Sequence, residues 1–290
     1  MDVSVLILNY NTRELTLQAI RSVRQSVTDF AYEIVLVDNA STDGAVEAVR
    51  REFPDVAVIV NDENVGFARA NNQAIRVAEG RYVLLLNSDT VVQTDTLDIM
   101  IRHMDEQPEV GASGCKVVLP NGTLDKACLR GFPTPEASFY YAFGFSKLFP
   151  GNPRFSQYQL NHLNPDLPHR IDCLVGAFML VRREAIEQVG VLDETFFMYG
   201  EDIDWCYRIK EAGWDISYYP LTRIIHYKGA SSRRKPAKII YEFYRAMWVF
   251  HQKHYRKKYA KVVNFSVFAG ISLKFALAIT MNAWRRGSKR

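Results

Sequence analysis

The stretch LLLNSDT, residues 84–90, decides the fold. An apolar run ends here and passes without a turn residue to three side chains that carry oxygen: Asn87, Ser88 and Asp89. Residues 82–87 have the composition of a strand that is buried on both faces, as in a parallel sheet. Ligands of such sheets bind beyond the carboxyl ends of the strands, so this polar trio is the first candidate site.

Short apolar runs alternate with helical segments through the first half of the chain. This alternation is typical of β-α-β units and predicts an α/β fold with a mostly parallel central sheet and flanking helices. The strands are predicted at 3–8, 33–38, 56–60, 82–87 and 111–119, and the helices at 13–26, 45–52, 67–78 and 95–106.

Polar residues follow each of the first four predicted strands. NYNT begins at Asn9, NASTDG at Asn39, NDENVGFARANN at Asn61 and NSDT at Asn87. One such run by itself is ordinary turn chemistry. Four of them at the carboxyl edge of one sheet predict a polar rim around a ligand.

The regular pattern is lost over residues 120–170, which are rich in Pro, Gly, Asn and aromatic residues. A connection of this length predicts a functional or mobile loop. Residues 171–190 then have the pattern of a strand that runs into a helix. Two more strands are predicted at 215–220 and 223–229, and Pro236 opens a last helical segment.

Charge is divided unevenly along the 290 residues. Residues 1–222 contain 19 Lys and Arg against 31 Asp and Glu, whereas residues 223–290 contain 17 against one. A basic end of this kind suits an anionic surface, either nucleic acid or lipid headgroups. The composition otherwise allows one large α/β domain, or a core domain with an appendage.

The four cysteines lie far apart, without a C-x-x-C pair. This spacing argues against a zinc ribbon or a disulfide framework and favours reduced, mostly buried thiols in a cytosolic setting. The N-terminus begins almost directly with a strand pattern and lacks the charged and apolar regions of an export signal. We therefore expect a cytoplasmic protein.

The apolar segment 262–284 is long enough, as a helix of about 34 Å, to cross a bilayer. Lys274 interrupts it, so a position in the membrane interface is favoured, with Trp284 at headgroup level and the basic residues of 256–261 on anionic lipid. Spanning the bilayer, or packing against the domain or a second subunit, are the alternatives.

Glu201 and Asp202 follow Gly200 at a predicted helix start. Simple capping of the helix is the alternative explanation. The aromatic residues of 196–199 and Trp205 would shelter these acids from water, and a sheltered carboxylate can accept a proton from a sugar hydroxyl. Asp202 is the better candidate of the two.

Asp89 and His226 are the candidate metal ligands. Mg²⁺ and Mn²⁺ prefer oxygen ligands such as those of Asn87 and Asp89, with a diphosphate and water completing the shell. His226 follows a predicted strand, where a histidine is more often a packed or surface residue. It is nevertheless the natural partner if the ion needs a second protein ligand.

Six blocks in order resemble the inverting family 2 glycosyltransferases of the GT-A fold, especially their rhamnosyltransferase-like branch. The blocks are VSVLILNYNT, VDNASTDG, NVGFARANNQAI, LLLNSDT, GAFMLVRREAI and FFMYGEDIDWCYRI, within residues 3–230. The resemblance implies a GT-A domain over 1–235, with a nucleotide-binding half at 1–119 and an acceptor-binding half at 120–235. Residues 236–290 are expected to form a basic amphipathic helical tail at the membrane interface.

The resemblance also implies roles on the nucleotide side. Asp38 matches the acid that contacts the nucleobase. Asn9 and Tyr10 match the wall beside the base and ribose, and Gly66 and Asn72 fall in the block that closes over the nucleoside.

The resemblance gives the remaining site residues roles at the metal and the acceptor. Asn87, Ser88 and Asp89 match a D-x-D-type motif whose first acid is Asn here, with Asp89 as its metal-binding acid. Asp202 matches the catalytic base of an E-D motif with Glu201 beside it, and His226 matches a metal ligand. Gly176 matches the wall near the acceptor, and Trp205 is expected on the same side.

The implied reaction is an inverting, metal-assisted transfer without a covalent intermediate. The favoured donor is dTDP-L-rhamnose, with UDP-sugars next, and the expected acceptor is a saccharide on polyprenyl diphosphate at the cytoplasmic face of the membrane. Loss of one acid leaves a non-catalytic sugar-nucleotide-binding protein as an alternative. A nucleic-acid-binding module would explain the basic tail but not the acidic half, so nucleic acid is not expected as a partner. A dehydrogenase is disfavoured because no G-x-G-x-x-G follows the first strand.

Overall fold

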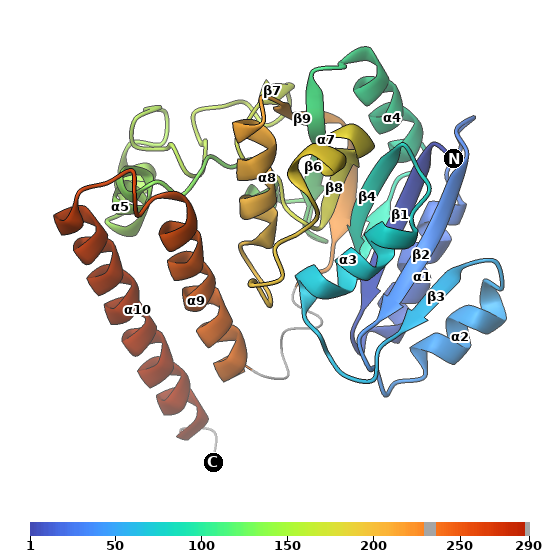
Figure 1. Cartoon of the computed structure of the whole chain (residues 1–290), viewed down its shortest axis with the longest axis horizontal. Helices are drawn as coiled ribbons and strands as arrows, with labels where there is room; N and C mark the ends of the chain where they lie inside the picture. The colour runs from blue at the N-terminus through green and yellow to red at the C-terminus, as the bar shows by residue number, and fades with distance from the viewer. Residues whose placement is uncertain (229–235, 288–290) are drawn as a thin grey trace.

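The computed structural model describes residues 1–228 and 236–287, and its centre is a single sheet (Figure 1). Nine strands form this sheet in the described part of the chain, in the order β3-β2-β1-β4-β8-β6-β9-β5, with β7 paired to β9. The strands are β1 (Val3–Asn9), β2 (Tyr32–Asp38), β3 (Ala57–Val60), β4 (Tyr82–Asn87), β5 (Thr90–Val92), β6 (Val110–Val118), β7 (His169–Arg170), β8 (Phe178–Arg182) and β9 (Asp215–His226).

Helices flank the sheet, and two long ones stand at the end of the molecule away from β3 (Figure 1). The helices are α1 (Arg13–Arg24), α2 (Ala45–Glu52), α3 (Phe67–Val77), α4 (Thr96–Glu106), η1 (Lys126–Cys128), α5 (Pro135–Ala142), α6 (Phe145–Leu148), α7 (Arg183–Val189), α8 (Glu201–Glu211), α9 (Pro236–His254) and α10 (Lys261–Gly287). The α/β fold class predicted from the sequence is therefore confirmed.

The first four strands in the sheet order are parallel, as their unbroken apolar composition predicts. Their register aligns the carboxyl ends, because Asn9 of β1 lies opposite Asp38 of β2 and Leu8 lies opposite Asn87 of β4. Polar residues from three strands therefore meet at one edge, as the sequence predicts.

Beyond β4 the sheet is mixed. Strand β8 runs antiparallel to both β4 and β6 and separates them, so β6 does not pair with β4. The two predicted strands 215–220 and 223–229 belong to one strand, β9, which ends at His226; residue 229 lies outside the described residues. Its register against β6 jumps from Tyr219 to Arg223, which leaves Pro220 in a bulge where it need not donate a hydrogen bond.

One continuous hydrophobic core joins the two predicted halves of the domain. Buried residues from Val3 to Ile224 belong to the same cluster, which therefore crosses the predicted boundary at residue 119. All four cysteines are free and buried, as expected.

Helix α9 packs onto the domain through a second apolar cluster. Phe250 and Tyr255 are buried there against Phe196 and Tyr207. The side chain of His254 also contacts that of Asp204 in α8, at 2.7 Å. The predicted tail therefore divides, since α9 is docked to the domain whereas α10 contacts chiefly α9.

Candidate functional site

A buried hydrogen-bond network ties three strand ends together. The Asn9 side chain donates to Asp38 Oδ1 at 2.6 Å, and its Oδ1 atom accepts a hydrogen bond of 2.8 Å from Thr12 Oγ1. The Thr12 hydroxyl lies 3.0 Å from that of Ser88. Asn9 therefore joins the ends of β1 and β2 directly and that of β4 through Thr12, which fixes the shape of the polar edge.

Asp38 is almost fully buried at this edge. Its second oxygen accepts a 2.8 Å hydrogen bond from the backbone N–H of Ser41, so both carboxylate oxygens are already engaged within the chain. Tyr10 is half-buried in the loop that follows Asn9. This loop includes Asn11, whose positive φ of 55° turns the chain toward α1.

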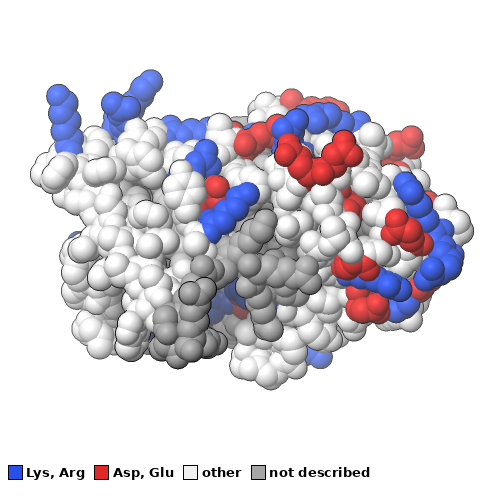
Figure 2. All heavy atoms as spheres, turned by 90° about the horizontal axis from the view of Figure 1, so that it is seen from below, with Lys and Arg blue, Asp and Glu red and all other residues white. Residues whose placement is uncertain are grey.

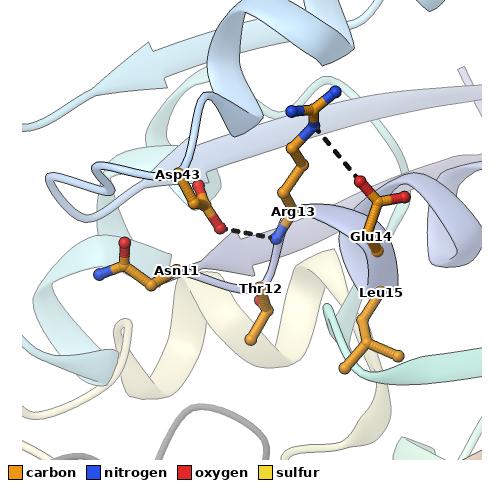
Figure 3. Close-up of a pocket in the computed structure, with 6 residues that line it drawn as sticks. All are labelled: Asn11, Thr12, Arg13, Glu14, Leu15 and Asp43. Atoms are coloured by element: carbon orange, nitrogen blue, oxygen red, sulfur yellow. Dashed lines mark hydrogen bonds and ion pairs between the residues drawn. The ribbon is translucent and has the colours of Figure 1, made fainter.

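An open cavity of about 440 Å³ lies beside this network, at the start of α1 (Figure 3). Its wall includes Thr12, which also contacts Ser88, so the cavity adjoins the polar edge. Asp43 Oδ2 accepts a 2.8 Å hydrogen bond from the Arg13 backbone N–H and so closes one side. Its volume falls in the range of small-molecule sites. The lining residues are Asn11, Thr12, Arg13, Glu14, Leu15 and Asp43.

Asp89 and His226 lie side by side at the end of β4. His226 Nε2 is 3.2 Å from Asp89 Oδ1, and His226 Nδ1 is 3.4 Å from Asp125 Oδ2, without hydrogen-bond geometry for that second contact. All three side chains are buried. Burial opposes a charge on the imidazole, but the two carboxylates outweigh it and raise the pKa of His226 to about 9.

These residues fit part of the coordination shell of a hard divalent cation. Asp89 offers a carboxylate, and His226 offers a ring nitrogen once an ion has displaced its proton, at a separation that the ion could bridge. Within residues 1–228 and 236–287, no group of three or more His, Cys, Asp and Glu side chains is arranged to hold a metal ion without other ligands, and this includes the site at Asp89. The diphosphate of a substrate would therefore have to supply the remaining ligands.

Asp202 is held by a largely buried arginine. Arg130 Nη2 donates to Asp202 Oδ2 at 2.8 Å, and the same nitrogen also donates to the carbonyl oxygen of Leu174. Burial disfavours the guanidinium charge, yet the Asp202 charge prevails and raises the pKa of Arg130. Among the described residues the other carboxylate oxygen accepts only the backbone N–H of Ile203, so it retains capacity for a substrate.

A backbone connection places Asp202 next to the end of β4. The N–H of Gly176 lies 3.4 Å from Asp202 Oδ2, and the carbonyl of Ala177 accepts a 3.1 Å hydrogen bond from the N–H of Asn87. A Cβ atom at Gly176 would lie 3.9 Å from that of Asp202. The candidate base and the D-x-D-like turn therefore adjoin the same short segment of chain.

Glu201 differs sharply from its neighbour. It is buried, and its Oε2 atom has no hydrogen-bond partner among the described residues. Burial and then the adjacent Asp202 charge raise the pKa of Glu201. The neutral form of Glu201 is therefore favoured, whereas Asp202 has the guanidinium of Arg130 beside it.

The predicted nucleoside-closing block contacts the loop before α8. Gly66 has φ of +91°, and a Cβ atom there would lie 2.6 Å from the carbonyl oxygen of Phe197, so only glycine fits. Asn72 donates to the carbonyl of Leu192 at 2.9 Å and accepts from its N–H at 3.0 Å. Asn72 thus anchors this loop from a fully buried position.

Trp205 lies in the hydrophobic core instead of on the acceptor side. Its side chain is fully buried, and the indole N–H donates to the carbonyl of Gly190 at 2.9 Å. The helix that carries Asp202 turns Trp205 toward the sheet. Aromatic character next to an acid was a misleading signal for this residue.

Three residues that organise the site were missed in the sequence. Arg130 and Asp125 lie in the long connection after β6, whose irregular composition gives no indication of their partners. Thr12 belongs to the NYNT run, and its position three residues after Asn9 is the one local signal that could have identified it.

Comparison with known proteins identifies the family of the chain. The family model described as glycosyl transferase family 2 matches residues 4–190. An N-acetylglucosaminyl-diphospho-decaprenol L-rhamnosyltransferase of Mycobacterium tuberculosis is 26% identical over 91% of this chain and 88% of its own length. The rhamnosyltransferase WbbL of Escherichia coli is 29% identical over 58% of this chain and 63% of its own.

A solved structure shows the same fold. A mannosyltransferase of Pyrobaculum calidifontis, in complex with GDP-Man and Mn²⁺, aligns with a TM-score of 0.59 at 20% identity, over 97% of this chain and 72% of its own. The family model covers well over half of the sequence. The chain therefore belongs to glycosyl transferase family 2.

Proposed function

We propose that this glycosyltransferase moves a sugar from a nucleotide-diphosphate donor to a hydroxyl of a saccharide acceptor, with inversion at the anomeric carbon. One observation carries the proposal. Asp202, which is paired with Arg130, adjoins through Gly176 and Ala177 the turn that bears Asp89. A proton acceptor and a diphosphate-binding residue thus flank the same space.

The polar edge supplies the donor site. Asp38 and Asn9 would shape the wall beside the base and ribose through their shared hydrogen bond, with Tyr10 beside them. Asn87 and Ser88 lie where the diphosphate would pass. The Ser88 hydroxyl contacts that of Thr12, so its main contribution is to fix the conformation of the turn and not to contact the diphosphate.

Asp89 and His226 would hold Mg²⁺ or Mn²⁺, with the donor's phosphates completing the shell. The bound ion would neutralise negative charge on the departing nucleoside diphosphate. Because Asn87 replaces the first acid of the motif, Asp89 carries the carboxylate ligation alone. We expect ion and nucleotide to bind together and not independently.

Asp202 accepts the proton of the acceptor hydroxyl as that oxygen attacks the anomeric carbon directly. The bond to the nucleoside diphosphate breaks in the same displacement, so the configuration inverts and no glycosyl-enzyme forms. General-base catalysis of this kind contributes roughly 10²–10⁴ in rate. Arg130 fixes one carboxylate oxygen and leaves the other toward the substrate.

The relatives support a finer assignment of donor and acceptor. Two of them are named rhamnosyltransferases, and one of these names a diphospho-decaprenol acceptor. We propose dTDP-L-rhamnose as the donor, with a UDP-sugar as the alternative, and a polyprenyl-diphosphate-linked saccharide as the acceptor. Such a carrier would place the enzyme at the cytoplasmic face of the membrane, in the synthesis of a surface polysaccharide.

Thermal-shift measurements with a panel of nucleotide sugars, with and without Mn²⁺, test the donor assignment. A true donor raises the melting temperature through its binding free energy, and more strongly with the ion present. Asp89→Asn should remove the effect of the ion. Equal shifts with all nucleotides, independent of Mn²⁺, would contradict the proposed site.

A further inference from the structure

Helix α10 presents an apolar stripe that the described residues leave uncovered. The most apolar 18-residue window within residues 261–284 has a mean hydropathy of 1.9, and none of that window is buried. Trp284 is 77% exposed and Phe265 is 70% exposed. A spacing of three or four residues places the members of the stripe on one side of the helix. They are Val262, Phe265, Ala269, Leu273, Leu277, Met281 and Trp284.

The opposite side of α10 packs along α9. Phe268 contacts Trp248 with ring centroids 5.0 Å apart, and Phe275 contacts Tyr244 at 5.8 Å. These pairs lie two turns apart, so α10 is held lengthwise against a helix that is itself docked on the domain. Crossing a bilayer would require α10 to leave this contact or to carry charged α9 with it.

The hydroxyl groups within the stripe are satisfied by the helix itself. Ser266 Oγ donates to the carbonyl of Val262 at 2.9 Å, and Thr280 Oγ1 donates to that of Ala276 at 3.1 Å. These groups therefore need no water when the stripe is buried in an apolar medium. Lys274 has a long aliphatic stem that can carry its charge back to water.

The α5–α6 segment adds a second exposed apolar patch at the same end of the molecule (Figure 1). Phe143 is 68% exposed and Leu148 is 71% exposed. Phe132, just before α5, packs in the same cluster as Tyr255 and Tyr259 of the turn between α9 and α10. This shared cluster places the patch near the start of α10.

Basic residues accompany α10, and its own sequence contains no acid. The sequence contains no Asp or Glu after Glu242, whereas Arg256 and Lys257 lie in the turn before α10 and Lys261 is its first residue. Seen from below, the surface over α9 and α10 carries scarcely any charge apart from basic side chains at its edge (Figure 2). Two copies of this surface would bring their basic edges together and repel each other, whereas anionic lipid would be attracted to those edges.

We propose that the α10 stripe and the α5–α6 patch together form a surface that enters the headgroup region of an anionic bilayer, with α10 lying parallel to the membrane. Interfacial helices combine buried apolar area with electrostatic attraction in this way. The purpose of this surface, which is to hold the active site near a lipid-linked acceptor, rests on the proposed function. The membrane binding itself does not.

Sedimentation of the full-length protein with vesicles tests this surface. The vesicles contain phosphatidylcholine alone or phosphatidylcholine with phosphatidylglycerol. The variants are Leu273→Glu with Leu277→Glu in the stripe, and Phe143→Ser with Leu148→Ser in the patch. Val27→Glu, at an exposed apolar residue of the opposite end, is the matched control. Nucleotide binding by each variant verifies that it is folded.

We expect the wild type and the control to bind anionic vesicles alike. The stripe variant should bind at least tenfold more weakly and the patch variant severalfold more weakly, and high salt should release the wild type. Binding that resists alkaline extraction would overturn the parallel orientation in favour of a span. Dimers that the stripe variant dissociates, with vesicle binding unchanged, would assign the stripe to a second copy. Absent vesicle binding with intact nucleotide binding would refute this surface and leave the proposed transfer untouched.

Discussion

The ion pair between Arg130 and Asp202 allows a sharp test of how the candidate base is held. The two groups meet at 2.8 Å, and each side chain is 13% exposed. Removing one partner of a buried pair leaves an uncompensated charge and costs about 3–5 kcal/mol. Because solvent reaches the edge of this pair, we expect Arg130→Leu to lose about 3 kcal/mol of unfolding free energy.

Thermal denaturation over a range of pH measures this loss. A cost of about 3 kcal/mol lowers the melting temperature by roughly 5 °C in a protein of this size. The deficit should shrink as the pH falls, because the unpaired carboxylate of the variant can escape the penalty by taking up a proton. Arg130→Lys keeps the positive charge and should retain most of the stability and a substantial part of kcat.

Arg21→Leu is the matched control, because it breaks a similarly short pair with Glu52 that is exposed to solvent. Exposed pairs contribute little, so this variant should melt close to the wild type. If Arg130→Leu melted together with this control and turned over at the wild-type rate, Arg130 would neither stabilise nor position Asp202.

Three further outcomes follow from the site. Gly66→Ala should lower stability by about 1–3 kcal/mol and weaken donor binding, because its Cβ would collide with Phe197; unchanged melting and affinity would contradict this. Asp89→Asn and His226→Gln should each weaken Mn²⁺-dependent donor binding by roughly 10- to 100-fold in calorimetry, and undiminished binding would remove them from the metal site. Glu201→Gln should flatten the dependence of melting temperature on pH. Because the pKa of Glu201 is raised in the folded state, the wild type has stability below pH 4.5 that is lost as the pH rises through the pKa of the folded state. Parallel curves of melting temperature against pH for the two proteins would refute a neutral Glu201.

Most of the first half of the fold could be predicted because its signals are local. The apolar run 82–87 coincides with β4, and the helical pattern 45–52 coincides with α2. Parallel pairing and short crossovers then bring the carboxyl ends of the strands to one edge. This is why Asn9, Asp38 and Ser88 were predicted at one site and are found in one network.

The second half depends on contacts between distant residues, which a local pattern does not contain. Strand β8 pairs with β4 and β6 and lies between them. Its apolar composition is that of any central strand, so the sequence does not indicate which strands it pairs with. The pair formed by Arg130 and Asp202 spans 72 residues, so neither residue's neighbours reveal it. Trp205 was misplaced for the same reason, since its position on α8 faces the sheet and not the cleft.

The most direct test of the transfer mechanism compares wild type and Asp202→Asn with the same donor, acceptor and Mn²⁺. The substitution keeps the shape of the side chain and removes its capacity to accept a proton. Turnover should fall by roughly 10²–10⁴ while the Kd of the donor nucleotide stays nearly unchanged. A variant that still transfers sugar at the wild-type rate, or that loses nucleotide binding along with transfer, would contradict the role of Asp202 as the base.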